Sequence, residues 1–309
     1  MVVGDLILDQ YIWGNVHRIS PEAPVPVLQV DRESWRLGGA ANVYQNICSL
    51  GGDARLCGVI GKDESGKSLL TQLKHHQSGK EGIICDTQRP TTKKTRVVAH
   101  HQQIVRFDVE APTPLSHAMN KQLLRRVAGQ LSEATCVVIS DYAKGVISSS
   151  FMTGLRQLIA GKNIPIIVDP KVEHISYYTD VTVITPNHWE ASQAASLLSD
   201  GHLPVEEAGP LLRSKLGCQS VLITRGEQGM SLYDGHGKGW DVPTFARQVY
   251  DVTGAGDTVV GTLALAISAG ATMREAAMIA NQAAGLVVGM MGTGSVTQSQ
   301  LREGLCHGS

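Results

Sequence analysis

Several features that define common protein classes are missing from this sequence of 309 residues. Its 27 lysines and arginines are balanced by 28 acidic residues, so the net charge of -1 provides no field that attracts nucleic acid or an anionic membrane. The six cysteines show none of the short paired spacings typical of zinc sites. No apolar run reaches the roughly 18 residues of a membrane span, and no signal peptide is recognisable. These absences predict a cytoplasmic protein without a nucleic-acid or membrane partner.

The sequence does contain regular alternation of helical and extended patterns, and its hydrophobic content of 42% is enough for a large core. We expect helices at 117–131 and 150–160, and strands at 136–140, 164–168, 181–185 and 220–224. Such alternation predicts an α/β fold with a doubly wound, mostly parallel sheet and helices on both faces. Polar residues follow several of these strands, at the sheet edge where ligands bind.

Two extended stretches near the N-terminus do not fit this alternation. The first lies within about 10–32 and contains three prolines, which confine it to a sheet edge. The second, within about 88–110, has apolar residues on both sides of a polar turn and predicts a hairpin. We expect the two stretches to pair into a small β-sheet that forms a lid over a substrate, with an ordinary edge hairpin as the alternative.

A glycine-rich turn, Gly254-Ala255-Gly256-Asp257, precedes an apolar helical stretch. Glycine lets the main chain approach phosphate oxygens, and the start of a helix offers unpaired N–H groups and a favourable dipole. Asp257 has the wrong charge for binding phosphate, so we interpret it as the base that takes a proton from an attacking hydroxyl. The alternative is an acid that caps its own helix.

A second group of residues suits a polyol. Asp5 and Asp9 are expected at the carboxyl end of a first strand over 1–8, where carboxylates accept hydrogen bonds from sugar hydroxyls. Gly38 and Gly39 permit close approach of a ligand, and Asn42 can both donate and accept. These five residues predict sugar binding, although loop capping is an alternative for the two acids.

The sequence resembles the ribokinase-like carbohydrate kinases in three segments: 38–42, 187–190 and 251–257. Within that family it is similar to the kinase domains of bacterial ADP-heptose synthesis enzymes in three more: 18–27, 140–145 and 249–258. The resemblance covers nearly the whole chain. It implies a single ribokinase-like domain over 1–309, with no second nucleotidyltransferase domain in this chain.

The resemblance also implies a reaction. The substrates would be ATP and D-glycero-β-D-manno-heptose 7-phosphate, phosphorylated at its anomeric hydroxyl in a step toward the inner core of lipopolysaccharide. A ribokinase-like kinase of another sugar or sugar phosphate is one alternative. A sugar- or nucleotide-binding module without catalysis is a second.

Individual roles follow from the same resemblance. It implies that Asp257 is the base and that Gly254, Ala255 and Gly256 form an anion hole for the moving phosphoryl group. Asn187 and Glu190 match the family's Asn-x-x-Glu motif, which implies Mg²⁺ held mainly through water. A capping box at a helix start is the alternative for this pair.

The resemblance implies further ligand contacts. Thr224 and Gly226 would contact the nucleotide, and Asp251 and Thr253, with the loop 292–295, would hold a monovalent cation such as K⁺. A distal phosphate on the sugar requires cations, for which the candidates are Arg106, Lys144 and Lys171. Each of the three could instead belong to a structural ion pair. Family members often pair through their projecting sheets, which implies a homodimer.

Overall fold

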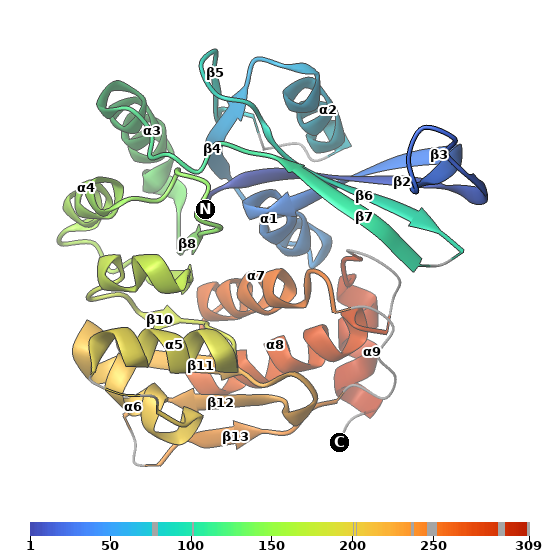
Figure 1. The fold of residues 1–309 in the computed structure, drawn as a ribbon. Helices are drawn as coiled ribbons and strands as arrows, with labels where there is room; N and C mark the ends of the chain where they lie inside the picture. The colour runs from blue at the N-terminus through green and yellow to red at the C-terminus, as the bar shows by residue number, and fades with distance from the viewer. Residues whose placement is uncertain are drawn as a thin grey trace.

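The computed structural model describes residues 1–75, 80–100, 102–199, 201, 203–235, 238–245, 252–289 and 294–307. Within these ranges the main sheet has nine strands, in the order β13-β12-β11-β10-β9-β8-β1-β4-β5 (Figure 1). Their bounds are β1 (Val2–Gly4), β4 (Leu56–Gly61), β5 (Gly82–Asp86), β8 (Val137–Ser140), β9 (Ile166–Asp169), β10 (Val183–Ile184), β11 (Ser220–Thr224), β12 (Met230–Tyr233) and β13 (Trp240–Val242). Every pairing from β5 to β11 is parallel, and only the β12 and β13 edge is antiparallel. The predicted mostly parallel sheet is confirmed.

Helices cover both faces of this sheet. They are α1 (Ala40–Ser49), α2 (Glu64–Gln72), α3 (His117–Gln130), α4 (Ser149–Ile159), α5 (His188–Leu198), α6 (Val205–Leu216), α7 (Ala255–Ser268), α8 (Met273–Val287) and α9 (Gln298–His307). Successive strand residues point to opposite faces, so Val2 packs with α1, α2, α7 and α8 while Val3 packs with α3 to α6. None of the helices in the described ranges is both long and apolar enough to cross a membrane.

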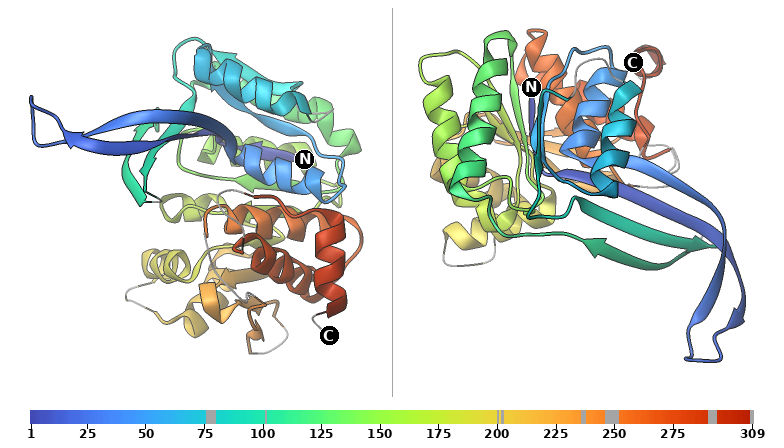
Figure 2. Two further views of the ribbon diagram at one scale, coloured as in Figure 1. Left: turned by 90° about the vertical axis from the view of Figure 1, so that its right-hand side faces the viewer. Right: turned by 90° about the horizontal axis from the view of Figure 1, so that it is seen from above.

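A smaller sheet has the order β3-β2-β6-β7 and consists of β2 (Leu6–Ile19), β3 (Pro26–Gly39), β6 (Thr92–Ala99) and β7 (Gln102–Val109). The two predicted extended stretches do pair, through the parallel contact of β2 with β6. Figure 2 shows the β2–β3 hairpin extending well beyond the body of the molecule. The first stretch was predicted too short. Its prolines lie at the hairpin tip or begin β3, so they interrupt neither of the two 14-residue strands.

The prediction of one strand over residues 1–8 is wrong. The chain leaves the main sheet after Gly4 and enters the small sheet at Leu6, so only Asp5 lies between the two. Its N–H donates to the Ser140 carbonyl at 3.2 Å, and its own carbonyl accepts from Ala40 at 3.0 Å. Asp9 consequently lies inside β2 of the small sheet and does not follow a strand of the main sheet.

The joint at Asp5 coincides with the point where the strand order of the main sheet reverses. β1 lies between β4 and β8, and later strands extend the sheet away from β8 toward β13. In open α/β sheets the crevice for ligands lies at the carboxyl ends of the strands at this reversal. The topology therefore predicts a ligand site at the residues that follow β1 and β8.

Candidate active site

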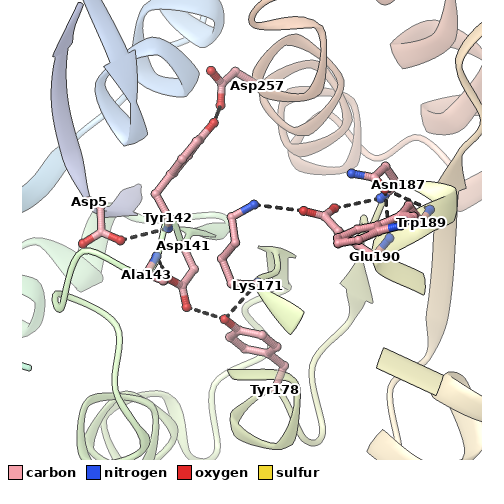
Figure 3. A network of polar contacts seen from close by, with 10 residues as sticks. All are labelled: Asp5, Asp141, Tyr142, Ala143, Lys171, Tyr178, Asn187, Trp189, Glu190 and Asp257. Atoms are coloured by element: carbon pink, nitrogen blue, oxygen red, sulfur yellow. Dashed lines mark hydrogen bonds and ion pairs between the residues drawn. The ribbon is translucent and has the colours of Figure 1, made fainter. Parts of the chain in front are cut away.

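Asp257 lies in the first turn of α7 and is 5% exposed. Its Oδ2 accepts a hydrogen bond from Asn42 Nδ2 at 2.7 Å. Its Oδ1 accepts one from the Tyr142 hydroxyl, also at 2.7 Å (Figure 3). Burial raises the pKa of Asp257 to about 6, against the opposing effect of the two hydrogen bonds. The result is an oriented carboxylate that can accept a proton near neutral pH.

The glycine-rich turn forms the start of α7 without a side-chain cap. Gly254 is the N-cap residue with φ of 81°, a left-handed conformation that suits glycine. Thr258 ties the turn to α1 by donating to Asn46 Oδ1 at 3.1 Å. The hydrogen bonds of Asp257 go to Asn42 and Tyr142 and not to its own helix, which does not favour the capping alternative. Binding of an anion at this helix N-terminus stays a prediction.

The loop that follows β8 is held by two buried carboxylates. Asp5 accepts hydrogen bonds from the main-chain N–H groups of Tyr142, Lys144 and Val146, at 2.8 to 3.1 Å. Asp141 accepts one from Ala143 at 2.7 Å. Burial raises the pKa of Asp5 to about 6, and the charge of Asp141 adds to the rise. Both oxygens of Asp5 are thus engaged by the loop, and its contact with a sugar stays a prediction.

Tyr142 was missed as a site residue by sequence reasoning. The ammonium groups of Lys94 and Lys171 each lie 5.4 Å from the centroid of its ring. Its hydroxyl reaches Asp257, which is 115 positions away in the chain. Tyr142 itself was noted only as part of the segment 140–145, which resembles a family motif, and nothing in the local pattern indicates this long-range contact.

Gly38 and Gly39 are predicted to bind sugar, but packing inside the protein already accounts for glycine at these two positions. A Cβ on Gly38 would lie 2.2 Å from Asp9 Oδ2, and one on Gly39 would lie 2.5 Å from the Asp5 carbonyl. Gly39 also has φ of 57°. Packing thus requires both glycines, while Asp9 forms an ion pair with Arg96. Close approach of a ligand to these glycines stays a prediction.

Asn187 and Glu190 form the capping box that was the alternative interpretation. The Asn187 side chain accepts from the N–H groups of Trp189 and Glu190, and Glu190 Oε2 accepts from the Asn187 N–H at 3.0 Å (Figure 3). Glu190 Oε1 is bound by the Lys171 ammonium at 2.9 Å. Over the described part of the chain, no group of three or more His, Cys, Asp or Glu residues could hold a metal ion.

A cavity of about 480 Å³ lies beside the glycine-rich turn, between α7, α8 and the ends of β11 and β12. Among its lining residues are Thr224, Gly226, Met230, Ala255, Gly256, Val259, Asn281, Ala284 and Val288. The structure thus brings the two predicted nucleotide residues, Thr224 and Gly226, next to the turn. A mostly apolar lining with a few polar groups is typical of a small-molecule site.

The three predicted phosphate-binding cations are all paired with carboxylates. Arg106 lies 3.1 Å from Asp108, Lys144 lies 2.8 Å from Glu110, and Lys171 lies 2.9 Å from Glu190. The structural ion pairs considered as the alternative are therefore present. Whether these cations also bind phosphate stays a prediction.

The predicted monovalent-cation site lies only partly within the described residues. Asp251 lies outside them, as do 292 and 293 of the late loop. Of the remaining loop residues, Ser295 accepts a hydrogen bond from Ser49 at 2.9 Å. Thr253 is described, and its role stays a prediction.

The chain belongs to the pfkB family of carbohydrate kinases, whose family model matches residues 1–300. Enzymes of this class are phosphotransferases with an alcohol group as acceptor, and a kinase of this kind uses ATP and a divalent metal. Among its relatives, the bifunctional protein HldE of Citrifermentans bemidjiense is 42% identical over 309 residues, which are 100% of this chain and 63% of that protein. The chain thus spans about 63% of the length of this relative.

Solved structures agree on the fold. Ribokinase from Thermotoga maritima superposes with a TM-score of 0.77 at 21% identity, covering 99% of this chain and 98% of that one. Phosphofructokinase-2 from Escherichia coli in complex with potassium gives a TM-score of 0.81 at 20% identity, with the same coverage. The predicted ribokinase-like fold is confirmed.

Replacing Asp5 with alanine tests the anchoring of the loop. The change leaves three main-chain N–H groups without their carboxylate acceptor, at about 1–3 kcal/mol each, and relief from burying the charge offsets part of this loss. We expect chemical denaturation to show a loss of about 2–4 kcal/mol in the free energy of unfolding. Asp53→Ala is the control, because the Asp53 side chain is 75% exposed. Unchanged or raised stability in Asp5→Ala would contradict the anchoring role.

Proposed function

We propose that the chain transfers the γ-phosphoryl group of ATP to the anomeric hydroxyl of D-glycero-β-D-manno-heptose 7-phosphate, yielding the 1,7-bisphosphate. This reaction would supply the ADP-heptose precursor of the lipopolysaccharide inner core, in the cytoplasm. The observation that carries the kinase chemistry is the buried carboxylate of Asp257, in the first turn of the helix whose residues Ala255 and Gly256 line the cavity. The choice of sugar rests on the resemblance to heptose kinase domains. A kinase of another sugar is the second candidate.

Asp257 would act as the general base. It takes the proton from the sugar hydroxyl as the hydroxyl oxygen forms a bond to the γ-phosphorus, while the bond from that phosphorus to the bridging oxygen of ADP breaks. The hydrogen bond from Asn42 fixes the carboxylate, and the Tyr142 hydroxyl occupies the position on Oδ1 that the sugar hydroxyl would take. The N–H groups at Gly254 to Gly256 would stabilise the charge on the transferred group.

Glu190 and Asn187 would hold a hydrated magnesium ion in this proposal. One carboxylate and one amide, from Glu190 and Asn187, suit Mg²⁺, which keeps several waters and binds phosphate oxygens of the nucleotide. When bound, the ion neutralises charge on the phosphates. Thr224 and Gly226 would contact the nucleotide in the adjacent cavity. We keep Asp251 and Thr253 as the candidates for a monovalent cation.

The first test replaces Asp257 with asparagine, which retains the shape but cannot accept the proton. We expect turnover with heptose 7-phosphate and Mg-ATP to fall by at least about 100-fold, measured as ADP release, while ATP binding is unchanged. Asp53→Asn, at an exposed position, should behave like the wild type. Normal turnover of Asp257→Asn would refute the base role. A wild type that is active only on another sugar would refute the choice of substrate.

A second test uses pH. Because burial raises the pKa of Asp257 to about 6, kcat/KM should fall as the pH drops below about 6 and the carboxylate becomes protonated. Tyr142→Phe removes a hydrogen bond that lowers this pKa, so the acidic limb of the profile should move to higher pH. Tyr233→Phe is the control, since that hydroxyl bonds to the Val205 carbonyl. An acidic limb at the same pH in all three proteins would contradict the assignment.

We further infer that two copies pair through the small sheet, which also serves as the lid. β7 is an edge strand, and Val105, Phe107 and Val109 share one of its faces at 49, 48 and 42% exposure. An exposed strand edge with apolar side chains is suited to contact with another chain.

The dimer is tested by Phe107→Glu, which places a charge in the middle of this apolar face. We expect light scattering to give twice the monomer mass for the wild type and the monomer mass for the variant. Leu197→Glu on α5 is the control, because Leu197 is 64% exposed and lies away from the small sheet. A monomeric wild type at micromolar concentration would remove the inference.

A further inference from the structure

Lys94, on the face of the small sheet that carries Asp9 and Asp108, makes no ion pair with the described residues. The carboxylates of Asp9, Asp108 and Glu110 are each paired with one cation, from Arg96, Arg106 and Lys144 respectively. Lys94 lies among these groups as a fourth cation, and the described residues offer it no carboxylate within ion-pair distance. Lys94 is thus a cation without an ion pair in this group, although the charges of Asp9 and Asp108 act on it.

Lys94 points to the candidate active site. On β6 it stands opposite Asp9 of β2 and Asp108 of β7, so it shares their face of the sheet. Its ammonium lies 5.4 Å from the centroid of the Tyr142 ring, and the hydroxyl of that ring binds Asp257. Tyr142 thus contacts both groups, and the charge of Lys94 acts on Asp257.

Lys94 is half-buried, and burial lowers its pKa. A desolvated ammonium without a carboxylate in ion-pair contact gains more from an incoming anion than one that is already paired with a carboxylate. Arg106, Lys144 and Lys171 would each have to give up an existing ion pair to bind an anion with full strength.

We propose that Lys94 binds the phosphate group that the sugar substrate carries, and thereby sets the preference for a phosphorylated over a neutral sugar. The inference rests on the proposed kinase function and adds a specificity residue to it. The ammonium approaches from the lid, so that the phosphate and the reacting hydroxyl lie at different ends of the sugar, one near Lys94 and the other at Asp257.

The test is Lys94→Met, which keeps the length of the side chain and removes its charge. We expect KM for heptose 7-phosphate to rise about 10- to 100-fold, the loss typical of a charged hydrogen bond. The values of kcat and of kcat/KM for the unphosphorylated heptose should change little, and Lys94→Arg should recover most of the lost affinity. The matched control is Lys93→Met, whose side chain lies on the opposite face of the same strand.

An unchanged KM for the sugar phosphate in Lys94→Met would overturn the proposal, as would an equal loss for both sugars. Thermal melting of each variant without ligand checks that it is folded. If the wild type releases no ADP with heptose 7-phosphate, the proposed function fails, and the role of Lys94 is then decided by binding. Phosphorylated hexoses and heptoses should raise the melting temperature of the wild type but not of Lys94→Met. Equal stabilisation of both proteins, or of neither, would overturn the role of Lys94.

Discussion

The carboxylate of Asp5 is the contact on which the rest of the site depends. It lies at the single residue between the two sheets, and it accepts three main-chain N–H groups from the loop after β8. That loop places the Tyr142 hydroxyl on Asp257. A charge buried this deeply is costly unless it is hydrogen-bonded, and here the bonds that offset the cost are also those that shape the site.

Asp257, like Asp5, is a carboxylate whose pKa is raised by burial. Its hydrogen bonds favour the ionised form, but burial dominates and keeps the pKa near 6. An acid with such a pKa is close to the ideal for proton transfer at neutral pH. A helix start with a purely structural role commonly has an exposed Ser, Thr, Asp or Asn as its N-cap. Here the N-cap is Gly254, which has no capping side chain, and the acid, Asp257, is buried in the first turn.

The sequence pattern predicted most of the main sheet, because apolar residues recur at different spacings in helices and in strands. It did not predict the break at Asp5, since residues 1–8 read as one apolar strand and the change of sheet depends on bonds to Ser140 and Ala40. It identified Asp257 from the glycines beside it. Tyr142 and Lys94 were missed because their contacts join distant segments. For the same reason, the pairing of Arg106, Lys144 and Lys171 could be raised only as an alternative.

The two ends of the β2–β3 hairpin adjoin, since Leu6 pairs with Gly39 and the Ala40 N–H bonds to the Asp5 carbonyl. Residues 6–39 therefore form an insertion whose entry and exit occupy one spot at the carboxyl edge of the main sheet. Such a module can change in length and side chains over evolution without disturbing the strand order of the main sheet. Diversity of substrate within one catalytic framework is the expected consequence of this architecture.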